Sequence, residues 1–157
     1  MGKKNKFFLI LAILFSLIFF PNQNLYANDD TIFLSLKKNE VYLRQGPSFK
    51  YPIKLIYKKK YLPVIYIEKS GPWKKIKDFQ NNTGWIHTAL LSKKKSAINT
   101  KKNSILFKKS TIYSEPLAKL EVGRLVLVHK CNEKWCKIYT DKYKGWILKK
   151  HLWGKKE

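Results

Sequence analysis

The chain has 157 residues, of which 33 are lysine or arginine and 10 are aspartate or glutamate, giving a formal net charge of +23 at pH 7. The positive electrostatic field of such a chain excludes basic partners and favours acidic ones. Association of this kind weakens as the salt concentration rises. Lysine outnumbers arginine by 31 to 2, although arginine is the residue that holds phosphates and bases in bidentate fashion. Together with abundant Asn, Ile, Phe and Tyr, the lysine excess is also typical of A/T-rich coding. The shortage of arginine argues against nucleic acid as a partner.

Residues 1–27 have the order of a secretory signal peptide. Three lysines precede an apolar stretch at 7–20, and polar residues then lead to the small Ala27. A basic start, an apolar middle and a small residue at the cut form the export pattern. The apolar stretch has 14 residues, whereas a membrane-spanning helix needs about 20. We therefore expect cleavage near Ala27, with an uncleaved N-terminal tether as the alternative.

Cleavage would leave a periplasmic or secreted chain with a net charge of +20. Disulfides persist in such compartments, and nucleic acids are not routine partners there. Export therefore supports the two conclusions that a cysteine pair is oxidised and that nucleic acid is not the ligand.

The rest of the chain repeats itself with a period of about 62 residues, which suits a small autonomous domain. The matching residues, first copy before second, are Trp73 and Trp135, Gly84 and Gly145, Trp85 and Trp146, and Pro52 and Pro116. We divide the chain into a signal peptide at 1–27, a first domain at 32–92, a linker at 93–97 and a second domain at 98–154.

Both copies are predicted to consist of strands. Runs rich in Val, Ile, Tyr, Trp and Leu lie, in chain order, at 61–68, 73–79, 125–130 and 135–140, with Gly-containing or polar breaks between them. No stretch after residue 28 has sustained helical periodicity. Short, closely spaced strands indicate an all-β fold of two tandem small barrels, since closure removes exposed sheet edges.

One departure from strand alternation occurs in both copies. Trp73 and Ile76 lie three residues apart, and so do Trp135 and Ile138. Inward-facing residues of a strand recur every two residues, so this spacing predicts a bulge or sharp bend. Because both copies share it, the bend is expected to belong to the fold.

Segment 41–48 reads Val-Tyr-Leu-Arg-Gln-Gly-Pro-Ser, and it precedes the Trp73 and Gly84-Trp85 motifs, while Leu152-Trp153-Gly154 closes the second copy. With these motifs the chain resembles the bacterial SH3-like domains found in exported proteins. The resemblance implies a five-to-six-stranded barrel and a recognition role, often toward cell-wall peptides or peptidoglycan, and it implies no enzymatic activity. Where Leu-Arg-x-Gly-Pro would stand, the second copy has Phe107-Lys108-Lys109-Ser110. This departure affects the ligand-binding loop of the second copy more than its fold.

Cys131 and Cys136 flank a predicted hairpin turn and are the only cysteines. In an oxidising compartment they predict a disulfide that pins the hairpin. The alternative is a metal site with His129 as third ligand, since His129 and Cys131 could point the same way on a strand. We favour the disulfide and expect neither a metal nor a cofactor.

No residue pattern indicates catalysis. The acids Asp78, Asp141, Glu68 and Glu121 form no spaced pair for general acid–base chemistry. The chain has no Gly-rich phosphate loop and no serine-nucleophile motif. The three histidines occupy non-equivalent positions in the two copies and receive no role. We expect the protein not to be an enzyme.

The candidate ligand-binding residues are Tyr51, Trp73, Trp135 and Arg44. Aromatic grooves are how SH3-like modules hold extended peptides, and Trp73 could form one beside the loop from Gln45 to Pro52. Trp73 and Trp135 could equally cap the core.

The candidate structural residues are Gly46, Pro47, Gly84, Trp85, Gly145 and Trp146. Trp85 and Trp146 follow a glycine at a strand start and are expected in the core. The glycines are expected to allow close backbone approach or positive φ.

These features together predict a non-catalytic binding module for an extended acidic peptide, with peptidoglycan stem peptides as the leading ligand. Two tethered copies would raise avidity on a polymer if both engage. The alternative is charge-driven adhesion to anionic lipid headgroups or envelope phosphate, and a third possibility is a scaffold for another envelope protein.

Overall fold

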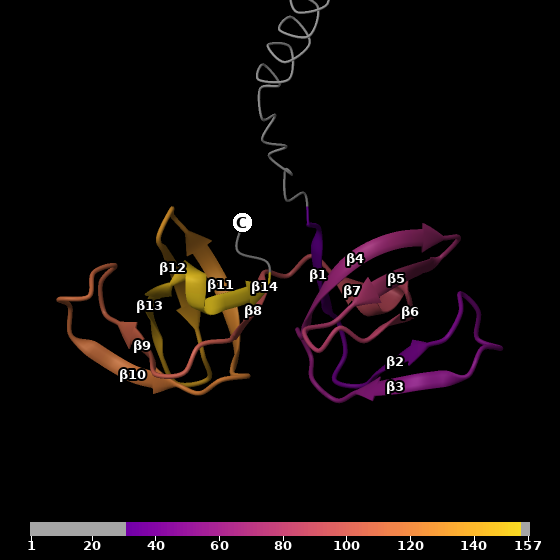
Figure 1. Cartoon of the computed structure of the whole chain (residues 1–157), viewed down its shortest axis with the longest axis horizontal. Coiled ribbons are helices and arrows are strands. Elements are labelled where there is room, and N and C mark those ends of the chain that lie inside the picture. The colour runs from indigo at the N-terminus through magenta and orange to yellow at the C-terminus, as the bar shows by residue number, and fades with distance from the viewer. Residues whose placement is uncertain (1–30, 155–157) are drawn as a thin grey trace, which may run out of the picture. The chain divides into compact units, whose positions relative to one another are not determined.

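The computed structural model describes residues 31–154, which form two seven-stranded antiparallel sheets, one for each repeat (Figure 1). The predicted signal peptide at 1–27 lies outside the described residues. Within 31–154, no helix has the length and apolar character needed to cross a membrane.

The first sheet is built from the first copy. Its strands are β1 (Phe33–Leu36), β2 (Val41–Arg44), β3 (Ile53–Tyr57), β4 (Pro63–Ser70), β5 (Trp73–Lys77), β6 (Thr83–His87) and β7 (Leu91–Ser92), with the short 3-10 helix η1 (Thr88–Leu90) before β7. Their order across the sheet is β3-β2-β6-β5-β4-β1-β7. All-β structure is confirmed, but this order leaves β3 and β7 at its ends, so the predicted closure into a barrel is not confirmed.

The second sheet repeats this topology strand for strand. Its strands are β8 (Ser96–Asn99), β9 (Ser104–Phe107), β10 (Pro116–Leu120), β11 (Leu125–Cys131), β12 (Trp135–Tyr139), β13 (Lys144–Leu148) and β14 (Leu152–Gly154), with η2 (Lys149–His151) before β14. The order is β10-β9-β13-β12-β11-β8-β14, the first order shifted by seven strands. The predicted linker at 93–97 overlaps the first two residues of β8, which are buried.

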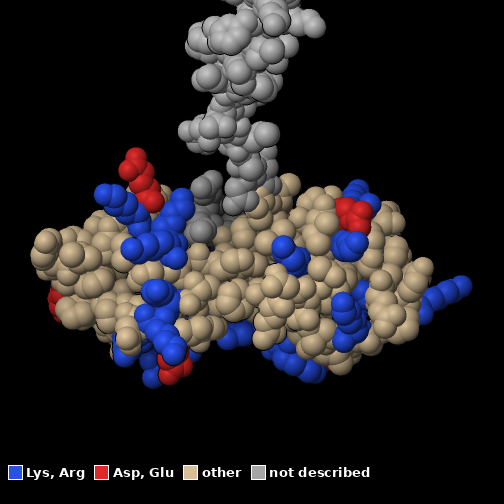
Figure 2. Space-filling model, viewed as in Figure 1, with Lys and Arg blue, Asp and Glu red and all other residues tan. Residues whose placement is uncertain are grey.

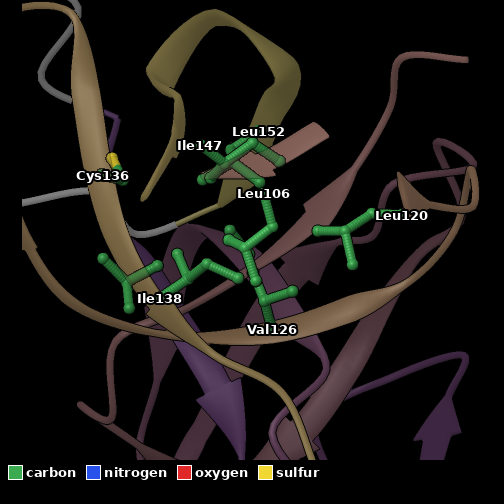
Figure 3. Packing of buried hydrophobic residues seen from close by; sticks show 9 residues of the cluster. Leu106, Leu120, Val126, Cys136, Ile138, Ile147 and Leu152 are labelled. Carbon is green, nitrogen blue, oxygen red and sulfur yellow. The ribbon is translucent and has the colours of Figure 1, made fainter. Parts of the chain in front are cut away.

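Each sheet has its own apolar cluster. The first consists of Leu34, Leu36, Val41, Leu43, Tyr57, Val64, Ile76 and Ile86. The second consists of Ala97, Leu106, Leu120, Val126, Val128, Cys136, Ile138, Ile147 and Leu152 (Figure 3). A fully buried Leu or Ile side chain contributes roughly 1.5–3 kcal/mol to the free energy of folding, so these clusters are a main source of stability in each sheet.

The predicted irregularity is present in both copies, but it lies on the neighbouring strand. The register shifts between Tyr66 and Glu68 on β4, and between Val128 and Lys130 on β11. β5 itself alternates, because Trp73 pairs with His87 while Ile76 pairs with Gly84 on the other face. Trp73 and Ile76 therefore lie on opposite faces of β5. Both are buried because both faces of the strand are covered.

The predicted close approach at Gly84 and Gly145 is confirmed. A Cβ at Gly84 would lie 2.7 Å from the Arg44 carbonyl oxygen, and one at Gly145 would lie 2.6 Å from the Phe107 carbonyl oxygen. Neither glycine has a positive φ. Glycine is therefore required at both places by space, since a side chain would push the adjacent strand away.

A buried carboxylate organises the turn between β5 and β6. Asp78 is 4% exposed and accepts hydrogen bonds from the Gln80 and Asn82 backbone N–H groups at 2.9 and 2.8 Å. The Tyr57 hydroxyl donates to Asp78 at 3.0 Å. Burial, followed by the Asp78 charge, raises the pKa of Tyr57, which therefore remains a neutral donor.

The two copies touch through aromatic rings. Trp153 on β14 contacts Phe33 on β1 at a centroid separation of 5.1 Å, and Phe79 at 5.5 Å. Both pairs are edge-on, an arrangement that adds to the attraction from burial alone. The closing tryptophan of the second copy is therefore covered by the first.

The predicted disulfide between Cys131 and Cys136 is confirmed, and it joins opposed residues of β11 and β12. Both sulfurs are thereby engaged, so the metal site with His129 is not formed. The Asn132 side chain accepts from the Lys134 and Trp135 backbone N–H groups at 3.1 and 2.7 Å, which closes the turn inside the disulfide.

The second copy also buries polar groups where the first is apolar. Asn99 and Ser104 are 0% exposed, and the Ser104 hydroxyl donates to Asn99 at 2.8 Å and lies 3.0 Å from His151 Nδ1. Their counterparts in the first copy are Leu36, Val41 and Leu90. Asn99 Nδ2 in turn donates to three backbone carbonyls, so the network is satisfied.

Replacing both Cys131 and Cys136 by alanine should lower the free energy of unfolding by about 2 kcal/mol, because a short closed loop restricts the unfolded chain only modestly. Urea unfolding of the variant and of the reduced wild type should give the same loss. An unchanged urea midpoint in both would show that the turn is held without the disulfide.

Burial, followed by Lys150 and Lys101, lowers the pKa of His151 below its ordinary value of 6.5. The unfolded chain therefore takes up a proton at a higher pH than the folded chain does. The contribution of His151 to the free energy of unfolding should be complete above about pH 6.5. It should decrease as the pH drops through that value. The loss of stability between pH 7.5 and 5 should be smaller in His151→Gln than in wild type or in His129→Gln, as measured by urea midpoints. Equal losses in all three proteins would contradict this prediction.

Candidate functional site

An aromatic cluster lies on the first sheet outside its apolar core. Trp73 is 5% exposed, yet it does not belong to the core cluster of the sheet. Its ring packs edge-on against Phe49, with centroids 4.9 Å apart, and against His87 at 5.3 Å. Phe49 itself is 69% exposed. Trp73 is thus buried by side chains of a surface loop and of β6, outside the apolar core.

The loop at 45–52, between β2 and β3, is held against the sheet by hydrogen bonds at its base. Arg44 Nη1 donates to the Tyr51 carbonyl at 2.8 Å, and the Gln45 N–H donates to the Pro52 carbonyl at 3.1 Å. The Arg44 guanidinium also lies 5.7 Å from the Phe49 ring centroid. These contacts place a cation beside the aromatic cluster.

Tyr51 packs on Gly46 rather than on the cluster. A Cβ at Gly46 would lie 2.6 Å from the Tyr51 ring, so the absence of a side chain there is what lets the ring lie flat on the loop. Tyr51 is 47% exposed and remains available to a ligand. Pro47 is half-buried in the same loop.

Phe49 and His87 are site residues that the sequence did not reveal. His87 stacks on Phe49 with centroids 5.7 Å apart and an interplanar angle of 22°. Its Nδ1 atom accepts from the Ala89 N–H at 3.3 Å, which leaves Nε2–H as the donor of the ring. Only the pairing of His87 with Trp73 across β6 and β5 brings this imidazole into the cluster.

A basic pocket adjoins the cluster. It has a volume of about 270 Å³ and is lined by Gln45, Lys54, Lys75, Thr83, Gly84 and Trp85. Lys54 Nζ donates to the Thr83 carbonyl at 3.0 Å, and Lys75 Nζ lies 6.0 Å from the Trp85 ring centroid. Arg44 pairs with Trp85 across β2 and β6, so the pocket and the aromatic cluster share one face of the sheet.

The expectation that Trp85 and Trp146 lie in the core is wrong. Both are half-buried, and neither belongs to an apolar cluster. Strand alternation is the reason: the glycine before each tryptophan and the isoleucine after it are buried, so the indole faces outward between them. Lysine side chains cover the outward rings.

The second copy keeps the tryptophan but not the polar groups around it. Trp135 is 8% exposed and packs against Phe107 at 5.8 Å. The strand registers place Phe107 where the first copy has Arg44, and Leu148 where it has His87. The counterparts of Phe49 and Tyr51 in the loop are Ile112 and Ser114. The predicted ligand-binding role of Trp135 therefore lacks the cation and the imidazole that accompany Trp73.

The loop registers also correct the alignment of the prolines. The Gln45 N–H bonds to the Pro52 carbonyl, and the Lys108 N–H bonds to the Glu115 carbonyl, so Pro52 corresponds to Glu115. Pro116 corresponds instead to Ile53. Lys108 and Glu115 form an ion pair at 2.9 Å, which raises the pKa of Lys108 and ties the base of this loop.

Residues 31–154 contain no group of three or more His, Cys, Asp or Glu side chains that could hold a metal ion. The site in the first copy consists instead of an aromatic cluster, an imidazole and nearby cations. Such a set suits recognition of a ligand that has apolar and anionic parts.

The sequence matches the family described as the bacterial SH3 domain over residues 37–93, and again over residues 102–154. The chain belongs to the bacterial SH3 domain family. Comparison with curated proteins gave no match.

Three solved structures are similar at low identity. NlpC2 from Trichomonas vaginalis has a TM-score of 0.37 and 12% identity, covering 81% of this chain and 49% of its own. NlpC1 from the same organism has a TM-score of 0.36 and 12% identity, covering 80% and 46%. An NlpC/P60 family protein from Bacillus cereus ATCC 10987 has a TM-score of 0.35 and 10% identity, covering 78% and 56%. The chain spans about half the length of these proteins.

Removing the exposed ring of Phe49 should uncover Trp73 without weakening the core. For Phe49→Ala we expect stronger acrylamide quenching of tryptophan fluorescence and a loss of unfolding free energy below about 1 kcal/mol, as for most surface changes. Ile112→Ala, at the matching position of the second copy, is the control for removing an exposed apolar side chain. Unchanged quenching in Phe49→Ala would mean that another group buries Trp73.

Proposed function

We propose that this bacterial SH3 protein is an exported, non-catalytic module that binds the stem peptides of peptidoglycan through its first copy. The observation that carries the proposal is the cluster of Phe49, Trp73 and His87 beside Arg44 and the basic pocket. Recognition of cell-wall peptides is frequent among SH3-like domains of exported proteins. The proposal includes cleavage near Ala27 and a periplasmic or secreted location.

The chemistry of the site fits a peptide with free carboxylates. A short extended peptide presents apolar side chains at intervals, which can pack on Phe49 and the edge of Trp73. Its carboxylates would meet Arg44 and the pocket lysine Lys54, while Lys75 is already paired with Glu68. The His87 Nε2–H offers a donor to a peptide carbonyl between them.

The surface charge supports the same class of ligand. Lysine and arginine side chains outnumber acidic ones over both copies in the view of Figure 2. The net charge of +20 without residues 1–27 steers acidic polymers toward the surface, while the aromatic cluster supplies attraction that salt does not screen.

Co-sedimentation of residues 28–157 with purified peptidoglycan sacculi tests the proposal. The sacculi should first be freed of attached phosphate-bearing polymers. We expect retention of wild type in salt well above the physiological level, because part of the attraction is aromatic packing. Soluble stem tetrapeptide should compete for this retention.

Phe49→Ala should weaken this retention at least tenfold, and Ile112→Ala should change it less than twofold. Release of wild type at modest salt, with equal behaviour of both variants, would favour charge-driven adhesion to anionic lipid or envelope phosphate. Absence of binding at every salt concentration would point to another envelope protein as the partner. Either result would overturn the peptidoglycan proposal.

A further inference from the structure

A second basic site lies on the second sheet, where two lysines approach one tryptophan. The registers pair Lys130 on β11 with Lys137 on β12, and Lys137 with Trp146 on β13. The three residues therefore form a row across adjacent strands. The two Nζ atoms lie 5.9 and 5.7 Å from the Trp146 ring centroid.

The equivalent row of the first copy is neutralised. It consists of Glu68, Lys75 and Trp85, paired in the same way. Glu68 Oε1 accepts from Lys75 Nζ at 2.9 Å, and Lys75 lies over the Trp85 ring. In this copy the lysine beside the tryptophan has an acidic partner on the neighbouring strand.

The second copy replaces the acid with another lysine. Like charges directly opposite each other on neighbouring strands destabilise a sheet. Within residues 31–154, the ion pairs are Lys58–Glu40, Lys75–Glu68, Lys108–Glu115 and Arg124–Asp141, and neither Lys130 nor Lys137 takes part in one. The second sheet thus holds two uncompensated charges beside one aromatic ring, an arrangement that an anionic ligand would relieve.

We propose that Lys130, Lys137 and Trp146 bind a phosphorylated sugar unit of an envelope polymer. Two ammonium groups on adjacent strands suit two anionic oxygens of a single phosphate, to which lysine contributes as a point charge. The half-buried indole provides an apolar wall for the sugar ring. This site is separate from the aromatic cluster of the first copy and does not depend on the peptidoglycan proposal.

The probes are N-acetylglucosamine 1-phosphate, N-acetylglucosamine, glucuronate and inorganic phosphate, titrated separately into ¹⁵N-labelled residues 28–157. We expect the sugar phosphate to shift the indole N–H signal of Trp146 at millimolar concentration and to leave that of Trp85 in place. The sugar alone, glucuronate and inorganic phosphate should each bind at least fivefold more weakly. Equal binding of glucuronate or of inorganic phosphate would overturn the proposal in favour of a general anion site, and an unmoved Trp146 signal would overturn it outright.

Reciprocal exchange of one residue between the copies provides the matched test. Lys130→Glu creates in the second copy the acid–lysine pair that the first copy tolerates, so the fold should be kept and affinity should fall at least tenfold. Glu68→Lys should instead make the Trp85 signal respond to the sugar phosphate. Lys38→Glu, an exposed change of the same charge in the first copy, should alter affinity less than twofold. If Lys38→Glu weakens binding as much as Lys130→Glu does, net charge rather than this site holds the ligand, and the proposal fails.

Discussion

The close approach of two strands at a glycine determines how each sheet presents its outer face. At Gly84 and Gly145 there is no room for a Cβ, because the carbonyl oxygen of the facing strand lies within 2.7 and 2.6 Å of where it would be. The glycine must therefore face inward, and alternation turns the next residue outward. In both copies that residue is a tryptophan, so a packing constraint of the interior fixes an aromatic ring on the exterior.

The outer face then acquires different chemistry in the two copies. In the first, the loop at 45–52 lays Phe49 over Trp73, and Arg44 and His87 join them. In the second, the same positions hold Phe107 and Leu148, while the charge lies further along the sheet at Lys130 and Lys137. The same topology thus carries two outer surfaces of different side-chain chemistry, an aromatic cluster in the first copy and a lysine pair in the second. Contact of Trp153 with Phe33 and Phe79 keeps the two copies together.

Stability is also arranged differently in the two copies. The first copy anchors a turn through the buried Asp78, while the second uses the disulfide between Cys131 and Cys136 and the Asn99–Ser104–His151 network. Buried polar groups of this kind contribute modestly to net stability, but leaving one of them unpaired is costly. They fix the turn after β5, the turn between β11 and β12, and the start of β9.

The sequence by itself determined the repeat, the all-β class and the family resemblance; it favoured the disulfide, and it marked Gly84 and Gly145 as positions that need close approach or positive φ. Each of these depends on local chemistry: strand-forming runs, paired motifs, a short cysteine spacing, and a residue without a side chain. Only the tertiary structure decided that Trp85 faces outward, that the bulge lies on β4 and not on β5, and that Pro116 corresponds to Ile53. These depend on register, and a shift of one residue exchanges the two faces of a strand. The participation of Phe49 and His87 was likewise decided by tertiary contacts, because the loop and β6 meet at Trp73 only after the sheet has formed.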